Sequence, residues 1–372
     1  MKIKILADQY LYKLDEMMPA EVELVRYNPD DGFPENAVEF DALLIRTVTK
    51  INSETLPEAG RLKFIGSATA GFDHVDQVYL ENLGINFERS EGCNANAVGE
   101  YVITVLYRWA QVQKADLHSK KIGIVGCGNT GSSVAHYLQK LGIETVLYDP
   151  PKARRESGFS SVGLEELLSC NILTFHTPLS RSGIHPTLHL CSEQWLGRGF
   201  DLIINTARGG VVDEQALLKA QSDGLVREYI LDVWEGEPVF EDDTGRKAFI
   251  ATPHIAGYSK QAKWKASEIV VKKMFRFFGL NRDIQKSADL VAAYSEVSGH
   301  QSSFAGFLWH HTNVKDYDHE LRKLFGLDDT EKALKFARLR SETETRNEFS
   351  AMMEGSNYIA ALPEEFRGFL NC

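Results

Sequence analysis

Short apolar runs alternate with stretches of helical spacing through residues 1–280 of the chain. Such alternation is typical of βαβ units built around a parallel sheet. Several of the runs are continuously apolar, as expected where helices cover both faces of a sheet. The pattern therefore predicts an α/β protein with doubly wound parallel sheets. The predicted strands are Ile3–Ala7, Ala42–Arg46, Lys63–Ser67, Ile85–Phe87, Lys121–Gly126, Thr145–Asp149, Ile172–His176, Leu202–Thr206, Tyr229–Val233 and Phe249–Ala251.

The same pattern divides the chain into three regions. Residues 1–95 form a first lobe, which residues 258–280 are expected to complete, and residues 96–257 form a second lobe. Residues 281–301 are polar and turn-rich, which indicates a linker, and the rest of 281–372 is a mixed segment without a motif that carries chemistry. The helices predicted from spacing are Ala97–His118, Ser132–Leu141, Glu214–Gln221, Asp316–Phe325 and Glu331–Thr345.

Charge and composition narrow the class of partner. The chain has 41 Lys and Arg against 52 Asp and Glu, a net charge of −11, which disfavours nucleic acid and anionic membranes because both need a basic face. Neither a signal peptide nor a membrane span is indicated. The five cysteines are scattered without CxxC spacing, which favours a reducing cytoplasm. No carboxylate or cysteine completes a ligand set for His300, His310 and His311, so no metal is expected.

A GxGxxG motif lies where a predicted strand ends and a predicted helix begins. Gly126 permits the tight turn, Gly128 lets the backbone approach a pyrophosphate, and Gly131 allows close packing of helix and strand. The helix start adds unpaired N–H groups and the positive end of the helix dipole, so anion binding here needs no lysine. The predicted cofactor-binding residues of this loop are Gly126, Gly128, Asn129, Thr130 and Gly131.

Asp149 ends the next predicted strand, about twenty residues beyond the loop, where dinucleotide-binding proteins place the acidic residue that binds the adenosine ribose. A carboxylate at this position also repels the additional phosphate of NADP. The alternative is an ordinary strand-ending aspartate in the turn Asp149-Pro150-Pro151. The fingerprint as a whole favours NAD as the cofactor.

Arg208, Glu237 and His254 each follow an apolar strand, and side chains at the carboxyl ends of parallel strands can converge. Oxidation of a 2-hydroxy acid needs a cation for the carboxylate, which suits the guanidinium of Arg208. It also needs a base near neutral pH, which suits His254, and a carboxylate that orients the base, which suits Glu237. Each residue alone has a structural alternative, as a surface arginine, a turn glutamate or a hydrogen-bonded loop histidine. Together they predict a hydroxy-acid dehydrogenase.

The order of these motifs resembles that of the D-isomer-specific 2-hydroxyacid dehydrogenase family. GxGxxG is followed by NTARGG at 205–210, DVWEGEP at 232–238 and TPHIAGYS at 252–259, and the likeness covers roughly residues 40–260. The resemblance implies that Arg208, Glu237 and His254 are catalytic. It implies a substrate lobe and a Rossmann NAD-binding lobe for the first two regions.

Further segments resemble one branch of this family, which oxidises 4-phospho-D-erythronate with NAD in the synthesis of pyridoxal phosphate. They include 44–50, 64–76, 92–95, 174–179 and 187–190, and the C-terminal segment resembles the α+β dimerisation domain of that branch. The resemblance therefore implies a cytoplasmic homodimer. By the same matching, Thr47, Thr69 and Tyr258 fall at substrate positions, and Thr177, Asp232 and Gly257 fall at NAD positions. Thr47 departs from the serine of the best-known relatives but keeps the hydroxyl.

A phosphorylated acid carries a second anionic group that Arg208 cannot serve as well as the first. Arg46 and Lys50, beside Thr47, are the candidate cations, and the position of Arg46 at a strand end favours it. A C-terminal arginine (Arg338, Arg340 or Arg346) is an alternative if the dimer is domain-crossed, although charges on helices are more often solvated.

Two other interpretations stay open from the sequence. One is a different dehydrogenase of the same family, such as phosphoglycerate dehydrogenase or a glyoxylate/hydroxypyruvate reductase, which would share the catalytic residues but not the long C-terminal segment. The other is a corepressor-like NAD sensor, for which lost or rearranged catalytic residues would be expected.

Overall fold

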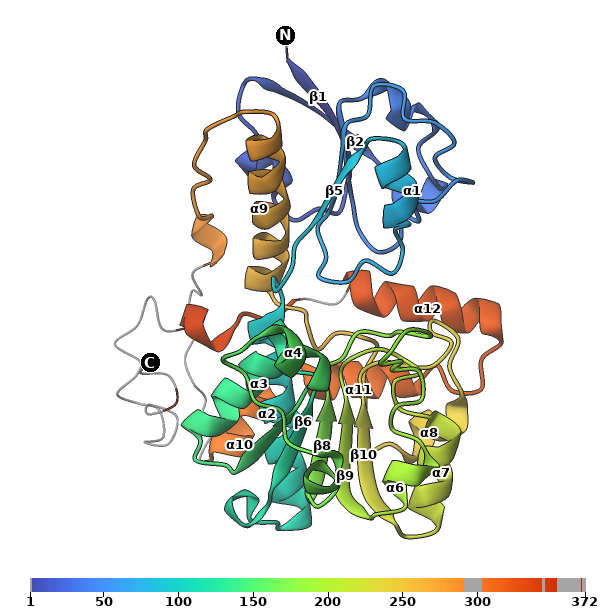
Figure 1. Ribbon diagram of the computed structural model, residues 1–372, viewed down its shortest axis with the longest axis vertical. Coiled ribbons are helices and arrows are strands. Elements are labelled where there is room, and N and C mark those ends of the chain that lie inside the picture. Colours follow the sequence, from blue (N-terminus) through green and yellow to red (C-terminus); the bar gives the residue numbers. More distant parts are fainter. Residues whose placement is uncertain (1, 291–302, 343–344, 353–368, 370–372) are drawn as a thin grey trace. The chain divides into compact units, whose positions relative to one another are not determined.

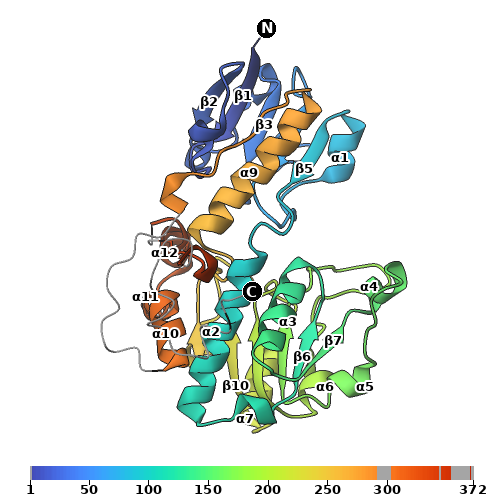
Figure 2. The same ribbon diagram turned by 90° about the vertical axis from the view of Figure 1, so that its left-hand side faces the viewer.

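The computed structural model describes residues 2–290, 303–342, 345–352 and 369. The chain divides into two compact units, shown in Figures 1 and 2. Unit 1 comprises Met1–Asn94 and Lys260–Leu290, and unit 2 comprises Ala95–Ser259 and Val291–Cys372. The C-terminal residues thus group with unit 2. Their predicted role in dimerisation stays a prediction, and much of the predicted linker lies outside the described residues, as does His300.

Unit 1 is built on a five-stranded sheet in the order β2-β1-β3-β4-β5, and every pair in it is parallel. Two of its inner strands, β3 and β4, are short and fully buried, as expected for a sheet covered on both faces. The strands are β1 (Ile3–Asp8), β2 (Val22–Tyr27), β3 (Ala42–Ile45), β4 (Phe64–Ser67) and β5 (Asn86–Arg89).

In unit 1, neighbouring residues of one strand pack into two different hydrophobic cores. On β3, Leu44 joins the core beneath α9 (Lys260–Phe277), whereas Leu43 joins the core on the opposite face, with Leu80 of α1 (Gln77–Asn82). Helix α9 lies so close to the sheet that a side chain at Gly66 would meet Val270 of α9 at 2.3 Å. The late segment that begins at Lys260 therefore completes unit 1, and Figure 2 shows α9 beside the strands.

Unit 2 holds a six-stranded sheet in the order β11-β10-β9-β8-β6-β7, again with parallel pairs throughout. The doubly wound α/β class predicted from the sequence is therefore confirmed. The strands are β6 (Ile122–Val125), β7 (Thr145–Tyr148), β8 (Ile172–Phe175), β9 (Phe200–Asn205), β10 (Val226–Leu231) and β11 (Ile250–Ala251).

The two faces of the second sheet are covered by different helices. On β9, Leu202 and Ile204 join the core that includes α2 and α3, whereas Ile203 joins the core formed with α5, α6 and α7. Figure 1 shows α2 and α3 together along the sheet. The helices of this part are α2 (Ala95–Gln113), α3 (Asn129–Lys140), α4 (Pro150–Arg155), α5 (Leu164–Leu167), α6 (Glu193–Leu196), α7 (Glu214–Ser222) and α8 (Asp242–Lys247).

Three C-terminal helices extend unit 2: α10 (Phe304–His311), α11 (Val314–Arg322) and α12 (Asp329–Glu342). The ring of Phe304 lies 4.8 Å from that of Tyr107 on α2, and Asp318 of α11 accepts the backbone N–H of Ala251 at 2.8 Å. Short 3₁₀ helices lie at Leu14–Met17, Pro29–Asp31, Glu35–Glu39, Leu117–Ser119, Ala288–Leu290 and Phe349–Met352. No helix in the described part of the chain combines the length and apolar character needed to cross a membrane.

Three differences from the predicted elements have local causes. The sequence analysis did not predict β2 (Val22–Tyr27), an edge strand paired only with β1 whose residues after Val22 are exposed or half-buried, so that it lacks the continuous apolar run of the inner strands. The long helix after Ala95 ends at Gln113, where Lys114 takes the left-handed conformation with φ 52°. Helix α3 begins at Asn129 rather than Ser132, because Gly128 itself is the N-cap.

Candidate active site

The glycine loop between β6 and α3 has a separate geometric reason for each of its glycines. Gly126 has φ +85°, and a side chain there would meet Thr177 at 2.8 Å. At Gly131, an added Cβ would stand 1.9 Å from the carbonyl oxygen of Gly126, so only glycine lets α3 approach the strand end. At Gly128, an added Cβ would meet nothing within 4 Å. The side of the loop at Gly128 is thus left open for a ligand.

The surroundings of this opening fit a dinucleotide. Strand β6 pairs with β7 on one side and β8 on the other, so the loop lies where the strand order reverses, which is the ligand position in open α/β sheets. Gly128 and Asn129 are exposed at the start of α3, where helical N–H groups point outward. The hydroxyl oxygen of Thr177 is buried and has no hydrogen-bond partner among the described residues. A buried polar atom of this kind calls for a partner, which a bound cofactor can supply.

Asp149 caps α4 and also fixes the glycine loop. Its Oδ1 accepts the N–H of Lys152 at 2.9 Å, and its Oδ2 accepts the N–H of Cys127 at 2.8 Å. The side-chain ammonium of Lys152 returns to the carbonyl oxygen of Cys127 at 2.7 Å. Asp149 is half-buried beside the loop, and its contact with the ribose stays a prediction.

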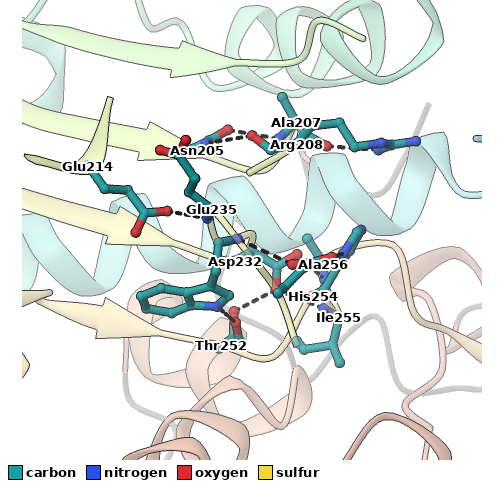
Figure 3. Close-up of polar contacts among 12 residues, drawn as sticks. Asn205, Ala207, Arg208, Glu214, Asp232, Glu235, Thr252, His254, Ile255 and Ala256 are labelled. Carbon is teal, nitrogen blue, oxygen red and sulfur yellow. Dashed lines mark hydrogen bonds and ion pairs between the residues drawn. The ribbon is translucent and has the colours of Figure 1, made fainter. Parts of the chain in front are cut away.

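Arg208, Glu237 and His254 follow β9, β10 and β11, which are neighbours in the sheet. Figure 3 shows Arg208 and His254 in this region. The structure brings Glu237 and His254 into direct contact, with the imidazole Nδ1 2.5 Å from Oε1 of the carboxylate. The other oxygen, Oε2, accepts the N–H of Trp234 at 3.2 Å. A charge-assisted contact between the predicted base and its predicted partner is therefore present.

The pairing determines which nitrogen of His254 can act. Because Nδ1–H donates to Glu237, Nε2 carries the lone pair and is the ring nitrogen that can accept a proton. Burial acts to raise the pKa of the Glu237 carboxyl, but the charge and hydrogen bond of His254, the charge of Arg340 and the N–H of Trp234 together lower it. The carboxylate therefore stays ionised and favours the imidazolium that forms when His254 accepts a proton.

The backbone around His254 is held in an uncommon conformation by Asp232. His254 has φ +58°, a left-handed conformation that non-glycine residues rarely adopt. Its N–H donates to the carbonyl oxygen of Asp232 at 2.6 Å, and the buried Asp232 carboxylate accepts the N–H groups of Ile255 at 2.8 Å and Ala256 at 2.9 Å (Figure 3). Asp232 therefore fixes the backbone of the His254 loop in this uncommon conformation.

Two residues that the sequence analysis did not single out extend this support. The hydroxyl of Thr252 donates to Asp232 at 2.6 Å, and the hydroxyl of Tyr101, fully buried on α2, lies 2.7 Å from that of Thr252. Since Thr252 uses its proton on Asp232, Tyr101 donates to Thr252. Thr252 lies in the TPH motif, which could have drawn attention to it, but Tyr101 looks like any core aromatic on a helix.

The loop of Arg208 is ordered by the end of β9. The Asn205 side chain accepts the N–H of Ala207 at 3.0 Å and donates to the Arg208 carbonyl oxygen at 3.1 Å. The Arg208 guanidinium donates to the Ala207 carbonyl oxygen at 2.8 Å. A side chain at Gly209 would stand 1.8 Å from the carbonyl oxygen of Trp234, so this glycine lets the loop lie against the segment that leads to Glu237.

The predicted substrate residues of unit 1 lie at the carboxyl ends of β3 and β4. Arg46 pairs through Nε with the fully buried Asp8 at 2.8 Å, and its guanidinium lies 5.0 Å from the ring centre of Tyr10, with 29% of the side chain exposed. Thr47 is exposed, whereas the hydroxyl of Thr69 donates to the carbonyl oxygen of Gly71 at 3.0 Å.

Two predicted binding residues of unit 2 follow His254 closely along the chain. They are Gly257 and Tyr258, and both are partly exposed. No three side chains of His, Cys, Asp or Glu gather as a metal site would require in the described ranges. His311 is half-buried, and burial lowers the pKa of its imidazole to about 4.

Comparison with known proteins agrees with this geometry. Residues 101–256 match the NAD-binding domain of the D-isomer specific 2-hydroxyacid dehydrogenases. The chain is 37% identical over 355 residues to erythronate-4-phosphate dehydrogenase of Escherichia coli O139:H28, covering 91% of this chain and 92% of that protein. It is 37% identical over 279 residues to the protein of the same name from Tolumonas auensis, covering 74% and 75%. The D-lactate dehydrogenase of Aquifex aeolicus, solved with NAD and lactic acid, shows the same fold with a TM-score of 0.58 and 24% identity, over 74% of this chain and 95% of that one.

The fold and the family match define the class, an NAD-dependent D-2-hydroxyacid dehydrogenase. Within this class, the identity and coverage are high enough to be specific. The chain belongs to the erythronate-4-phosphate dehydrogenase family.

Proposed function

We propose that the protein oxidises the C2 hydroxyl of 4-phospho-D-erythronate, giving (R)-3-hydroxy-2-oxo-4-phosphooxybutanoate, NADH and a proton. The name of the relatives that span most of the chain supports this substrate. The reaction type is carried by one observation, the contact of His254 with Glu237 at the ends of neighbouring strands. The proposed place of the reaction is the synthesis of pyridoxal phosphate.

In the proposed reaction, Arg208 binds the C1 carboxylate through its guanidinium and polarises the C2 oxygen. Nε2 of His254 accepts the proton of the C2 hydroxyl, and Glu237 stabilises the resulting imidazolium. The glycine loop would hold NAD, which would supply the acceptor for the hydride that leaves C2. The Asp232 carboxylate keeps the His254 loop in place during the transfer.

The remaining assignments concern binding. We propose that the hydroxyls of Thr47, Thr69 and Tyr258 bind the polyhydroxylated chain and that Arg46 binds the phosphate, supported by the position of β3 and β4. For NAD, the proposed contacts beyond the glycine loop are those of Asp149, Thr177, Asp232 and Gly257. The orphaned hydroxyl of Thr177 supports that assignment most directly.

We further propose a cytoplasmic homodimer in which the C-terminal helices contribute to the interface. Cys127, Cys170 and Cys191 are buried and are free thiols in the structure, which supports a reducing compartment. Light scattering coupled to gel filtration tests the assembly, and a mass near 42 kDa, that of one chain, would contradict the dimer.

The substrate is tested by NADH formation from 4-phosphoerythronate, 3-phosphoglycerate, lactate and glycerate under the same conditions. We expect kcat/KM to be highest for 4-phosphoerythronate. A preference for any of the other three acids would replace the proposed substrate while leaving the dehydrogenase class intact. Lack of turnover with all four acids, together with tight NAD binding, would favour an NAD sensor.

A further inference from the structure

We propose that Arg340, in the last turn of α12, is a positioning residue that holds Tyr258 and Glu237 in the active site of its own chain. The inference deepens the proposed function and rests on it, because it gives a role to a residue beside the His254–Glu237 pair. The sequence analysis considered Arg340 only as a cation for the cleft of a partner subunit. Its contacts within unit 2 point to its own chain.

The first observation is the contact of Arg340 with Tyr258. The guanidinium carbon lies 5.8 Å from the centre of the Tyr258 ring, within the range of a cation–π interaction. Tyr258 follows His254 by four residues and occupies a proposed substrate position. The Arg340 guanidinium therefore restrains the Tyr258 side chain, which lies in the same loop as His254.

The second observation is that the side chain of Arg340 is buried with one of its hydrogen-bond donors unused. Its Nε is buried and has no hydrogen-bond partner among the residues that the structure describes. A buried charged group with an unused donor is costly, so a contribution to stability does not explain why an arginine stands here. Such an exception calls for a functional reason, and the adjacent catalytic pair supplies one.

The third observation is electrostatic. Against the effect of burial, the charges of His254 and Arg340 both act to lower the pKa of the Glu237 carboxyl. Arg340 thus favours the ionised carboxylate that orients His254. Three further titratable groups interact with these two residues. The charges of Tyr258 and Asp232 act on Arg340. The charge of Glu237 acts on Glu214.

The chain just beyond α12 is fixed close to the same loop. The Arg346 side chain pairs with the fully buried Glu100 and donates to the carbonyl oxygen of Ala97 at 2.9 Å. The hydroxyl of Ser259, next to Tyr258, donates to the carboxylate of Glu348 at 2.7 Å. These contacts attach residues 345–352 beside the catalytic loop, so the position of Arg340 does not depend on its own interactions alone.

The extension distinguishes this chain from the Aquifex aeolicus enzyme. The Aquifex aeolicus enzyme aligns with 74% of this chain and 95% of its own length, so this chain carries about a quarter more residues. Both sheets are complete by the end of α9, and the additional residues therefore fit the segment that contains α12. Arg340 gives this segment a part in catalysis in addition to any part in assembly.

The test uses Arg340→Met, Arg340→Lys and the matched control Arg338→Met, since Arg338 is exposed on the same helix. Loss of a cation raises the pKa of neighbouring acids, so in Arg340→Met we expect the acid limb of kcat/KM to move up by about half a unit or more. We expect kcat to fall about 10-fold, with KM for 4-phosphoerythronate within about threefold. Arg340→Lys should restore most of the pH profile, and Arg338→Met should match the wild type.

Two outcomes would overturn the proposal. If KM rises for the phosphorylated acid alone and the acid limb stays in place, Arg340 binds the phosphate instead. If neither kcat nor the pH profile changes, it has no role in catalysis. A measurement without turnover separates this inference from the proposed reaction: NMR titration of the His254 ring in the NAD-bound protein, assigned with His254→Gln. The apparent pKa of the His254–Glu237 pair should rise in Arg340→Met even if the proposed substrate is wrong.

Discussion

The two units share a strand order but use its reversal point differently. In unit 1, β1 lies between β2 and β3, and in unit 2, β6 lies between β7 and β8. At this point unit 1 places charged side chains, since Asp8 ends β1 and pairs with Arg46 after β3. Unit 2 places bare backbone there, since Gly128 leaves open space beside the start of α3.

One architecture can therefore offer two kinds of binding surface. A backbone crevice at a helix start binds a pyrophosphate through N–H groups, whichever charges the rest of the protein carries. A charged side chain, in contrast, can discriminate between acids with and without a phosphate. The net charge of −11 disfavours some classes of partner, but it does not describe the local charge at either position.

Removal of the imidazole separates chemistry from cofactor binding within unit 2. In His254→Ala we expect kcat to fall about 10³-fold, because the proton acceptor is lost while the glycine loop is untouched. The dissociation constant for NAD, measured by fluorescence quenching, should stay within about twofold of the wild type. His118→Ala, at an exposed histidine of the same unit, serves as the control. Turnover that survives in His254→Ala would show that another group accepts the proton.

Removal of the cation in unit 1 should affect binding of one substrate and leave the chemistry alone. In Arg46→Ala we expect KM for 4-phosphoerythronate to rise about 10- to 100-fold, with little change for unphosphorylated erythronate. The variant also leaves the buried Asp8 without its cation, so some loss of thermal stability is expected. Comparing two substrates on one variant cancels that loss, and Arg61→Ala, whose pair with Asp41 is more exposed, is the matched control. Equal increases for both acids would exclude a phosphate site at Arg46.

The contrast between the units also explains what the sequence could predict. The glycine loop is contiguous, and its chemistry depends on spacing, so GxGxxG predicted the turn, the strand end and the open side at Gly128. Arg208, Glu237 and His254 were predictable because each follows an apolar strand. Only the parallel order of β9, β10 and β11 brings their loops to one edge of the sheet.

The support of the catalytic loop was not predictable in the same way. Tyr101 reaches Thr252 across 151 positions of the chain, and nothing in its own helix distinguishes it from other core aromatics. Arg340 depends on where an entire C-terminal helix packs. Such residues act through long-range contacts, which periodicity and motif spacing do not encode.

Removal of the Asp149 charge beside the glycine loop tests whether unit 2 binds NAD through backbone groups alone. In Asp149→Asn we expect KM for NAD to rise about 5- to 10-fold and the preference for NAD over NADP to narrow, because an amide no longer repels the additional phosphate. One oxygen remains to cap α4, so the helix should persist. Asp116→Asn, the same change at another cap in unit 2, controls for loss of a cap. An unchanged ratio of NAD to NADP turnover would reduce Asp149 to its structural contacts.

The smallest expected effect is on stability, and it concerns the buried carboxylates of the two units. Asp8 of unit 1 has a cation, whereas Glu214 of unit 2 accepts only the N–H of Glu235 at 2.6 Å, and its Oε2 has no hydrogen-bond partner within the described ranges. Burial and the charges of Glu235 and Glu237 raise the pKa of Glu214 from 4.5 to about 8.

Between these two values the folded state of the protein binds a proton on Glu214 that the unfolded state has released, so stability falls as pH rises through this window. In Glu214→Gln this loss is absent, and the amide oxygen can still accept the N–H of Glu235. We therefore expect the variant to match the wild type near pH 4.5 and to exceed it by about 1–2 kcal/mol above pH 8, measured by urea unfolding across the range. A constant difference at every pH would mean that the pKa of Glu214 is the same in the folded and unfolded states. The two units would then tolerate their buried carboxylates equally well.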